Sequence, residues 1–66
     1  MHVRINGEKR DIQDGLTVAG LLDSLGVDRR GVAVERNAEV VPKSTYGSVL
    51  LADEDKLEIV HFVGGG

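Results

Sequence analysis

The chain has 66 residues and a formal net charge of −3, with 41% hydrophobic and 29% charged residues. This balance is typical of one small globular domain and excludes a disordered chain. It also argues against a self-sufficient enzyme, because so small a core leaves no room for a deep substrate cavity. The acidic balance and the scarcity of aromatic residues argue against nucleic acid as a partner.

The sequence contains no cysteine, which removes disulfides and cysteine-based metal sites and fits a reducing cytoplasm. No apolar run approaches the ~20 residues of a membrane span. The start of the sequence also lacks the apolar block of a signal peptide. We therefore expect a cytoplasmic protein that does not act in a membrane.

The first segment predicts a β-hairpin. Val3 and Ile5 alternate with polar residues, which is the pattern of a half-buried strand. Asn6 and Gly7 both tolerate the positive φ of a type I′ turn. The returning segment 8–14 has one apolar residue, so we expect it to form a strand at the edge of a sheet.

The next segment predicts a helix. Thr17 suits the N-cap position, and Gly26 suits the left-handed position that ends a helix. Gly20 lies inside this helix and weakens it, which predicts close packing at that position. Four apolar residues share one helical face: Val18, Leu21, Leu22 and Leu25.

The second half predicts strands separated by short connections. Segment 31–37 reads as an inward-facing strand, Val40–Val41 as a short strand, and segment 56–62 as the last strand. We expect residues 43–48 to form a loop. The Asp-rich segment 52–55 is expected to form a solvated turn.

This order of elements predicts an α+β fold, a β-grasp with a mixed sheet of four to five strands packed on one main helix. The first and last strands have the highest apolar content, so we place them side by side and parallel in the centre of the sheet. The predicted domain covers residues 1–63, and residues 64–66 form a flexible Gly-Gly-Gly tail. The predicted core comprises Val3, Ile5, Val18, Leu21, Leu22, Leu25, Val32, Val34, Leu57 and Ile59.

The last strand predicts a partner-binding surface. If Leu57 and Ile59 face the helix, then Val60 and Phe62 lie on the open face of the sheet. Single exposed apolar residues are normal on a protein surface. Because Phe62 is the only phenylalanine and lies beside the glycine tail, we interpret Val60 and Phe62 as docking surface with Glu58 at its rim.

No side chains form a pattern typical of a catalytic or metal site. His2 and His61 lack the carboxylate or histidine spacing of a metal centre, and segment 53–55 lacks the ligand spacing of a calcium loop. The serine and threonine hydroxyls have no associated base. We therefore predict no metal and no catalytic side chain.

The main-chain carboxylate of Gly66 is the remaining reactive group. Attack of this carboxylate on the α-phosphate of ATP would give an acyl-adenylate, which a sulfur nucleophile could displace. Gly64 and Gly65 have no Cβ and could thread a narrow channel into the active site of a partner. The alternative is that the glycines are a disordered remainder without function.

Three stretches carry a family resemblance: "RING" at 4–7, "VERN" at 34–37 and "DEDKLEIVHFVGGG" at 53–66. Together they resemble the ThiS family, the sulfur carrier proteins of thiamin biosynthesis, and the resemblance covers the whole chain. A terminal Gly-Gly on a β-grasp is shared with ubiquitin, so that feature alone indicates only the ubiquitin-like superfamily. The combination of "ERN" with "IVHFVGGG" is more specific and indicates the thiamin branch.

The resemblance implies a protein co-substrate rather than an enzyme. A ubiquitin-activating-type adenylyltransferase (ThiF) would use ATP to adenylate Gly66. Sulfur from a cysteine desulfurase or an equivalent donor would then convert Gly66 to a thiocarboxylate (1-thioglycine). Thiazole synthase (ThiG) would use that sulfur to build the thiazole ring. The chain itself would hold no permanent cofactor, since ATP is used by the activating partner.

Three alternatives stay open at this stage. The small subunit of molybdopterin synthase is a related carrier that binds a different synthase. A ubiquitin-like modifier would use the same activated Gly66 to acylate lysines of other proteins. A plain interaction domain would tolerate the loss of Gly66 without losing its function.

Overall fold

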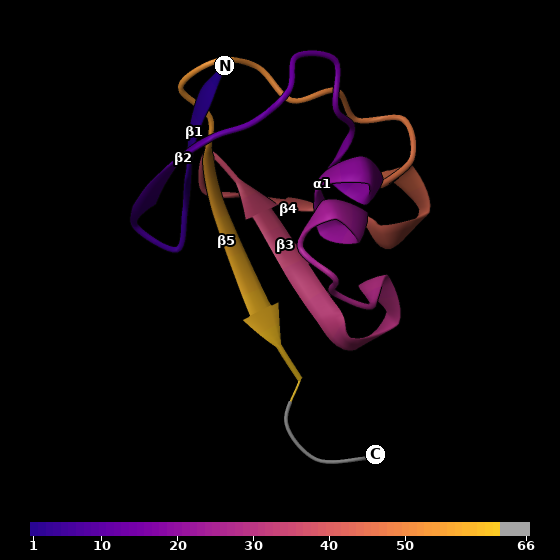
Figure 1. Cartoon of the computed structure of the whole chain (residues 1–66). Helices are drawn as coiled ribbons and strands as arrows, with labels where there is room; N and C mark the ends of the chain where they lie inside the picture. Colours follow the sequence, from indigo (N-terminus) through magenta and orange to yellow (C-terminus); the bar gives the residue numbers. More distant parts are fainter. Residues whose placement is uncertain (63–66) are drawn as a thin grey trace.

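In the computed structural model, which describes residues 1–62, a five-stranded mixed sheet packs against one α-helix (Figure 1). The helix is α1 (Val18–Ser24), and the strands are β1 (His2–Ile5), β2 (Glu8–Asp11), β3 (Val32–Arg36), β4 (Glu39–Val41) and β5 (Lys56–His61). Two 3-10 turns, η1 (Arg29–Gly31) and η2 (Lys43–Thr45), flank β3 and β4. The strand order is β2-β1-β5-β3-β4, and β5 pairs parallel with β1 and antiparallel with β3. The predicted α+β architecture and its central pair of parallel strands are confirmed.

The first hairpin has the predicted turn. Asn6 and Gly7 adopt φ values of 51° and 85°, so both central residues lie in the left-handed region that a type I′ turn requires. All four residues of β2 are exposed, and β2 is an edge strand as expected.

Asn6 also extends the pairing of β1 with β5 beyond the end of β1. Its side chain donates a hydrogen bond to the carbonyl oxygen of Ile59 (3.1 Å) and accepts one from the Ile59 N–H (2.8 Å). Its backbone N–H donates to the Leu57 carbonyl at 2.9 Å. The side-chain amide thus takes the place of a peptide unit in the ladder. It extends the pairing along β5 by two residues, from Leu57 to Ile59.

The helix begins and ends at the predicted residues. The Thr17 hydroxyl accepts a hydrogen bond from the Gly20 N–H (3.1 Å), and Gly26 has a φ of 71° just after the helix. A Cβ on Gly20 would lie 3.1 Å from Cδ2 of Leu16, which is the close packing that the glycine predicted. A helix this short is stabilised mainly by its packing against the sheet.

The core contains nine of the ten predicted residues, and the tenth, Leu25, is partly buried. Four buried apolar residues were not predicted: Ala19, Val41, Tyr46 and Leu51. Tyr46 is 1% exposed, and its hydroxyl makes no hydrogen bond to any part of the chain that the structure describes.

The loop expected over residues 43–48 contains a 3-10 turn, and the segment up to Val49 packs against the start of α1. Residues 43–45 form η2, and the carbonyl oxygen of Tyr46 accepts a hydrogen bond from the Ala19 N–H at 2.8 Å. The carbonyl of Val49 accepts one from the Val18 N–H at 3.0 Å. The segment therefore satisfies two backbone donors of the first helical turn, which have no partner within the helix.

The prediction of a solvated turn over residues 52–55 is wrong for Asp55, which is 4% exposed. Its carboxylate accepts hydrogen bonds from Arg36 Nε (2.7 Å), Asn37 Nδ2 (3.0 Å) and the Ala52 N–H (2.8 Å). Burial alone raises the pKa of the Asp55 carboxyl, but these hydrogen bonds outweigh it and hold the pKa below its ordinary value. The "ERN" motif is thus, in part, a structural connection between the β3–β4 turn and the start of β5.

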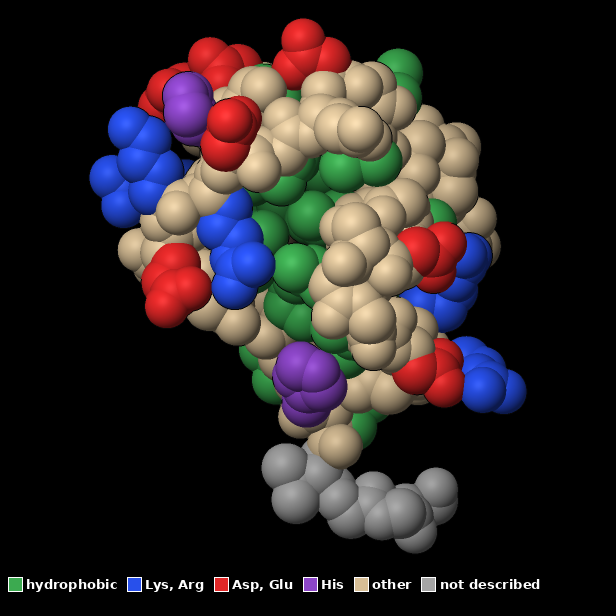
Figure 2. Space-filling view, viewed as in Figure 1, with side chains coloured by type: hydrophobic (Ala, Val, Ile, Leu, Met, Phe, Trp, Pro, Cys, Tyr) green, Lys and Arg blue, Asp and Glu red, His purple; other side chains and the backbone are tan. Residues whose placement is uncertain are grey.

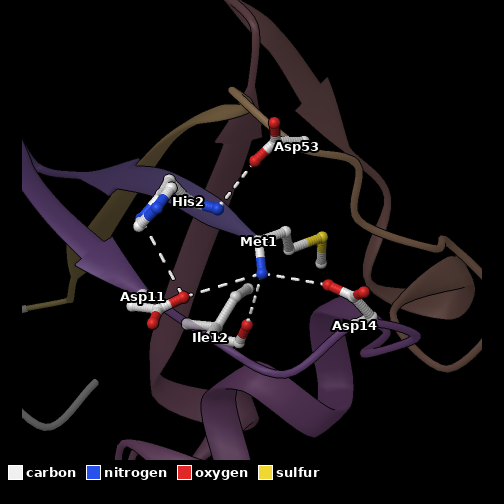
Figure 3. Close-up of polar contacts among 6 residues, drawn as sticks. All are labelled: Met1, His2, Asp11, Ile12, Asp14 and Asp53. Atoms are coloured by element: carbon white, nitrogen blue, oxygen red, sulfur yellow. Dashed lines mark hydrogen bonds and ion pairs between the residues drawn. The ribbon is translucent and has the colours of Figure 1, made fainter.

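Acidic side chains surround the start of β1. The Met1 ammonium donates hydrogen bonds to the Ile12 carbonyl and to Asp14, each at 2.9 Å, and lies 3.6 Å from Asp11 (Figure 3). Asp53 accepts a hydrogen bond from the His2 N–H at 2.7 Å. Asp and Glu side chains gather at this end of the molecule (Figure 2). None of the helices within residues 1–62 has the length and apolar character needed to cross a membrane.

Candidate functional site

The candidate site begins where β5 ends. The central strand β5 runs away from the end of the molecule that carries the N-terminus (Figure 1). The Phe62 N–H donates a hydrogen bond to the Gly31 carbonyl at 3.0 Å. Nζ of Lys43 lies 5.0 Å from the centroid of the Phe62 ring and donates to the Arg30 carbonyl at 3.1 Å. Contacts with η1 and η2 therefore hold the last residue that the structure describes.

The alternation of buried and exposed side chains along β5 is confirmed from Lys56 to Val60, whereas His61 at the end of the strand is exposed. Leu57 and Ile59 are buried against the core, whereas Glu58 is exposed, and Val60 and Phe62 are 52% and 59% exposed. Because Phe62 is not a core residue, its substitution should leave the packing around α1 intact. The role of Glu58, Val60 and Phe62 in binding a partner stays a prediction.

The tail residues Gly64, Gly65 and Gly66 lie outside the described residues, as does the predicted domain boundary at residue 63. The placement of these glycines relative to the sheet is therefore a prediction that the structure does not test.

His2 and His61 are both exposed and lie at opposite ends of the sheet. His2 Nδ1 lies 3.9 Å from the Asp11 carboxylate. Among residues 1–62, no group of three His, Asp or Glu side chains is arranged to hold a metal ion.

The sheet carries a shallow hollow of about 530 Å³ on the face opposite α1, referred to below as the open face. Its lining comprises Glu35, Asn37, Ala38, Lys56 and Glu58. The sequence did not predict that Glu35 lines this hollow. Glu35 lies there because the register of β3 against β5 places it opposite Glu58, and that register cannot be deduced from local sequence patterns. The contact between Lys43 and Phe62 was missed for the same reason, since it joins residues from distant segments.

The sequence model of the ThiS family matches residues 3–66, which is nearly the whole chain. The chain belongs to the ThiS family. A Bacillus subtilis relative named sulfur carrier protein ThiS is 43% identical over 67 residues, covering 97% of this chain and 98% of the relative. The crystal structure of the thiamine biosynthesis protein ThiS from Geobacter metallireducens matches 100% of both chains, with a TM-score of 0.86 and 32% identity. This structural match confirms the ubiquitin-like β-grasp fold.

A second kind of relative is longer than this chain. A protein from Paramagnetospirillum magneticum named thiazole synthase is 59% identical over all 66 residues. The chain spans 20% of the length of that relative, and the same share of a second thiazole synthase that it matches. In these proteins, a segment similar to a ThiS family member lies within a longer chain that carries the name of the synthase.

Proposed function

We propose that this chain is a sulfur carrier of thiamin biosynthesis and that it carries the sulfur on the carboxylate of Gly66. The observation that supports the role is similarity over nearly the full length of the Bacillus subtilis sulfur carrier protein ThiS. The family match also extends to residue 66, so it includes the glycine segment on which the chemistry depends.

The proposed chemistry begins with activation of Gly66. An α-carboxylate has an ordinary pKa of about 3.3–3.7, so it is ionised near neutral pH and can attack the α-phosphate of ATP. Pyrophosphate leaves, and the carboxylate becomes a mixed anhydride with AMP. The terminal sulfur of a persulfide then attacks the acyl carbon and displaces AMP. Cleavage of the S–S bond by a thiol leaves one sulfur on Gly66 as a thiocarboxylate.

The described part of the chain fits the role of a protein that presents a segment to other enzymes. Hydrogen bonds hold β5 in the centre of the sheet as far as Phe62, two residues before the first glycine of the tail, Gly64. Gly64 and Gly65 would let the backbone enter a narrow active site, because neither has a Cβ. Glu58, Val60 and Phe62 would contact the partner beside that entrance.

Three partners follow from this proposal. Thiazole synthase would accept the sulfur, as the longer relatives suggest by carrying a similar segment within one chain. An adenylyltransferase of the ThiF type would supply ATP and activation, and a cysteine desulfurase or an equivalent enzyme would supply sulfur. The chain would then be a co-substrate without a permanent cofactor. A cytoplasmic location, where ATP and persulfides are available, stays a prediction.

Entry of the tail into a narrow active site can be tested with Gly65→Val. The position of the terminal carboxylate can be tested by deletion of Gly66. Both changes should abolish ATP–pyrophosphate exchange by the cognate adenylyltransferase, because one blocks entry and the other moves the carboxylate. Gly47→Val is a matched control, since a Cβ on Gly47 would meet no atom within 4 Å. The control should support exchange at the wild-type rate, and all three variants should keep the wild-type Tm. Exchange at the wild-type rate by Gly65→Val would contradict the proposed entry of the tail.

A further inference from the structure

The open face carries a row of three cationic side chains and, beside it, a pair of acidic ones. Because Val3 and Ile5 of β1 are buried on the side of α1, Arg4 lies on the open face. Arg4 is paired with Lys9 of β2 on one side and with Lys56 of β5 on the other. Lys9, Arg4 and Lys56 are all exposed and form a cationic row across three adjacent strands.

The two acidic side chains lie on β3 and β5. Glu35 of β3 lies directly opposite Glu58 of β5 in the antiparallel register. Glu58 is exposed, whereas Glu35 is half-buried, so Glu35 is the less solvated residue of this acidic pair.

This arrangement costs stability in the free chain. Like charges directly opposite each other on a sheet are destabilising, whereas opposite charges at the same positions are stabilising. No ion pair within residues 1–62 involves the cationic row or the acidic pair. Lys56 precedes Glu58 by two residues on the same face of β5 and still forms no ion pair with it. The sorted charges are thus the cationic row and the acidic pair, which lie next to each other on the open face, although Asp11 of β2 and Glu54 lie close to the row.

Exposed apolar side chains border the acidic pair. Val40 of β4 is paired with Glu35 and is 73% exposed, and Val60 follows Glu58 on the same face of β5. Apolar contact supplies much of the binding energy at a protein interface, while charge complementarity determines partner choice, orientation and association rate.

We propose that the open face docks a protein partner of reversed polarity, with acidic side chains against the cationic row and basic side chains against the acidic pair. The inference rests on the proposed function, because the partner is thiazole synthase. A face on which a cationic row lies beside an acidic pair favours one orientation of the partner over the reversed one. Since β5 runs through the centre of this face, the docking orientation also fixes the direction in which β5 points on the synthase.

The test exchanges the charges without changing the net charge, in the double variant Arg4→Glu/Glu58→Arg. Each substituted side chain is then directly opposite residues of the other sign, Lys9 and Lys56 for position 4 and Glu35 for position 58, so the Tm of the free chain should rise by about 2–4 °C. Affinity for the cognate thiazole synthase should fall by about tenfold or more, because like charges meet across the interface. The exchange Asp23→Arg/Arg29→Glu on α1 and η1 is the matched control, and it should bind as the wild type does.

Binding of the exchanged variant within about twofold of the wild type would overturn the inference. Glu58→Gln is a milder second variant, and it should also raise the Tm and weaken binding. A Tm below that of the wild type in both variants would contradict the claim that the sorted charges cost stability. Thiocarboxylate formation on the wild type tests the proposed function separately. Its presence together with unchanged binding would overturn only the docking orientation.

Discussion

At the residue scale, the motifs that carry the family resemblance also have structural roles. Asn6 of "RING" forms the hairpin turn and pairs with Ile59 through its side chain. Arg36 and Asn37 of "VERN" hydrogen-bond the buried carboxylate of Asp55. These contacts join both hairpins to β5, so they determine where the central strand begins and how far it stays paired.

Asp55→Asn should lower the free energy of unfolding by about 1–3 kcal/mol at pH 7, because Arg36 loses the charge that it binds. The pKa of Asp55 lies below its ordinary value in the folded chain, so the unfolded chain binds more protons as the pH falls. The contribution of Asp55 is therefore fully present above the unfolded pKa of about 3.9 and is lost as the pH falls through the lower folded pKa.

Urea unfolding between neutral and acid pH checks this prediction. The stability difference between the wild type and Asp55→Asn should shrink as the pH falls below about 4. The same change at an exposed site, Asp23→Asn, should have little effect at any pH. A difference between the wild type and Asp55→Asn that is constant with pH would contradict a role for the Asp55 charge.

At the scale of elements, α1 depends on contacts outside itself. It has 7 residues, and the backbone donors of Val18 and Ala19 bond to carbonyl groups of segment 46–49. Leu22 is completely buried between α1 and the sheet. The helix, the segment after η2 and the sheet should therefore unfold together, as one cooperative unit.

Leu22→Ala should cost about 2–5 kcal/mol of stability, because it removes buried methyl groups and leaves a cavity. Leu50→Ala makes the same change at a side chain that is 61% exposed, and it should cost no more than about 0.5 kcal/mol. Equilibrium urea unfolding measures both values. Equal effects of the two substitutions would show that Leu22 is not part of the core.

At the scale of the whole molecule, local sequence patterns predicted most of the fold. Alternation identified the strands around Val3 and Ile59, and the spacing of the leucines identified α1. The burial of Tyr46 and Asp55 was not predictable, because their partners lie far away in the sequence and depend on packing and register. For the candidate site, the exposure of Val60 followed from the period of β5, whereas the pairing of Glu35 with Glu58 did not.

The central claim is that Gly66 carries sulfur through a free carboxylate at a fixed distance from the body of the chain. One residue added after Gly66 moves the carboxylate by up to about 3.3–3.6 Å, and a displacement of about 1 Å can already cost a hundredfold in rate. The most direct measurement is the intact mass of the chain after incubation with ATP, a sulfur source and the cognate adenylyltransferase. We predict that one oxygen is replaced by sulfur in the wild type and that the chain extended by one residue is unchanged. Thiocarboxylate on the extended chain without prior trimming, or its absence from the wild type, would contradict the account.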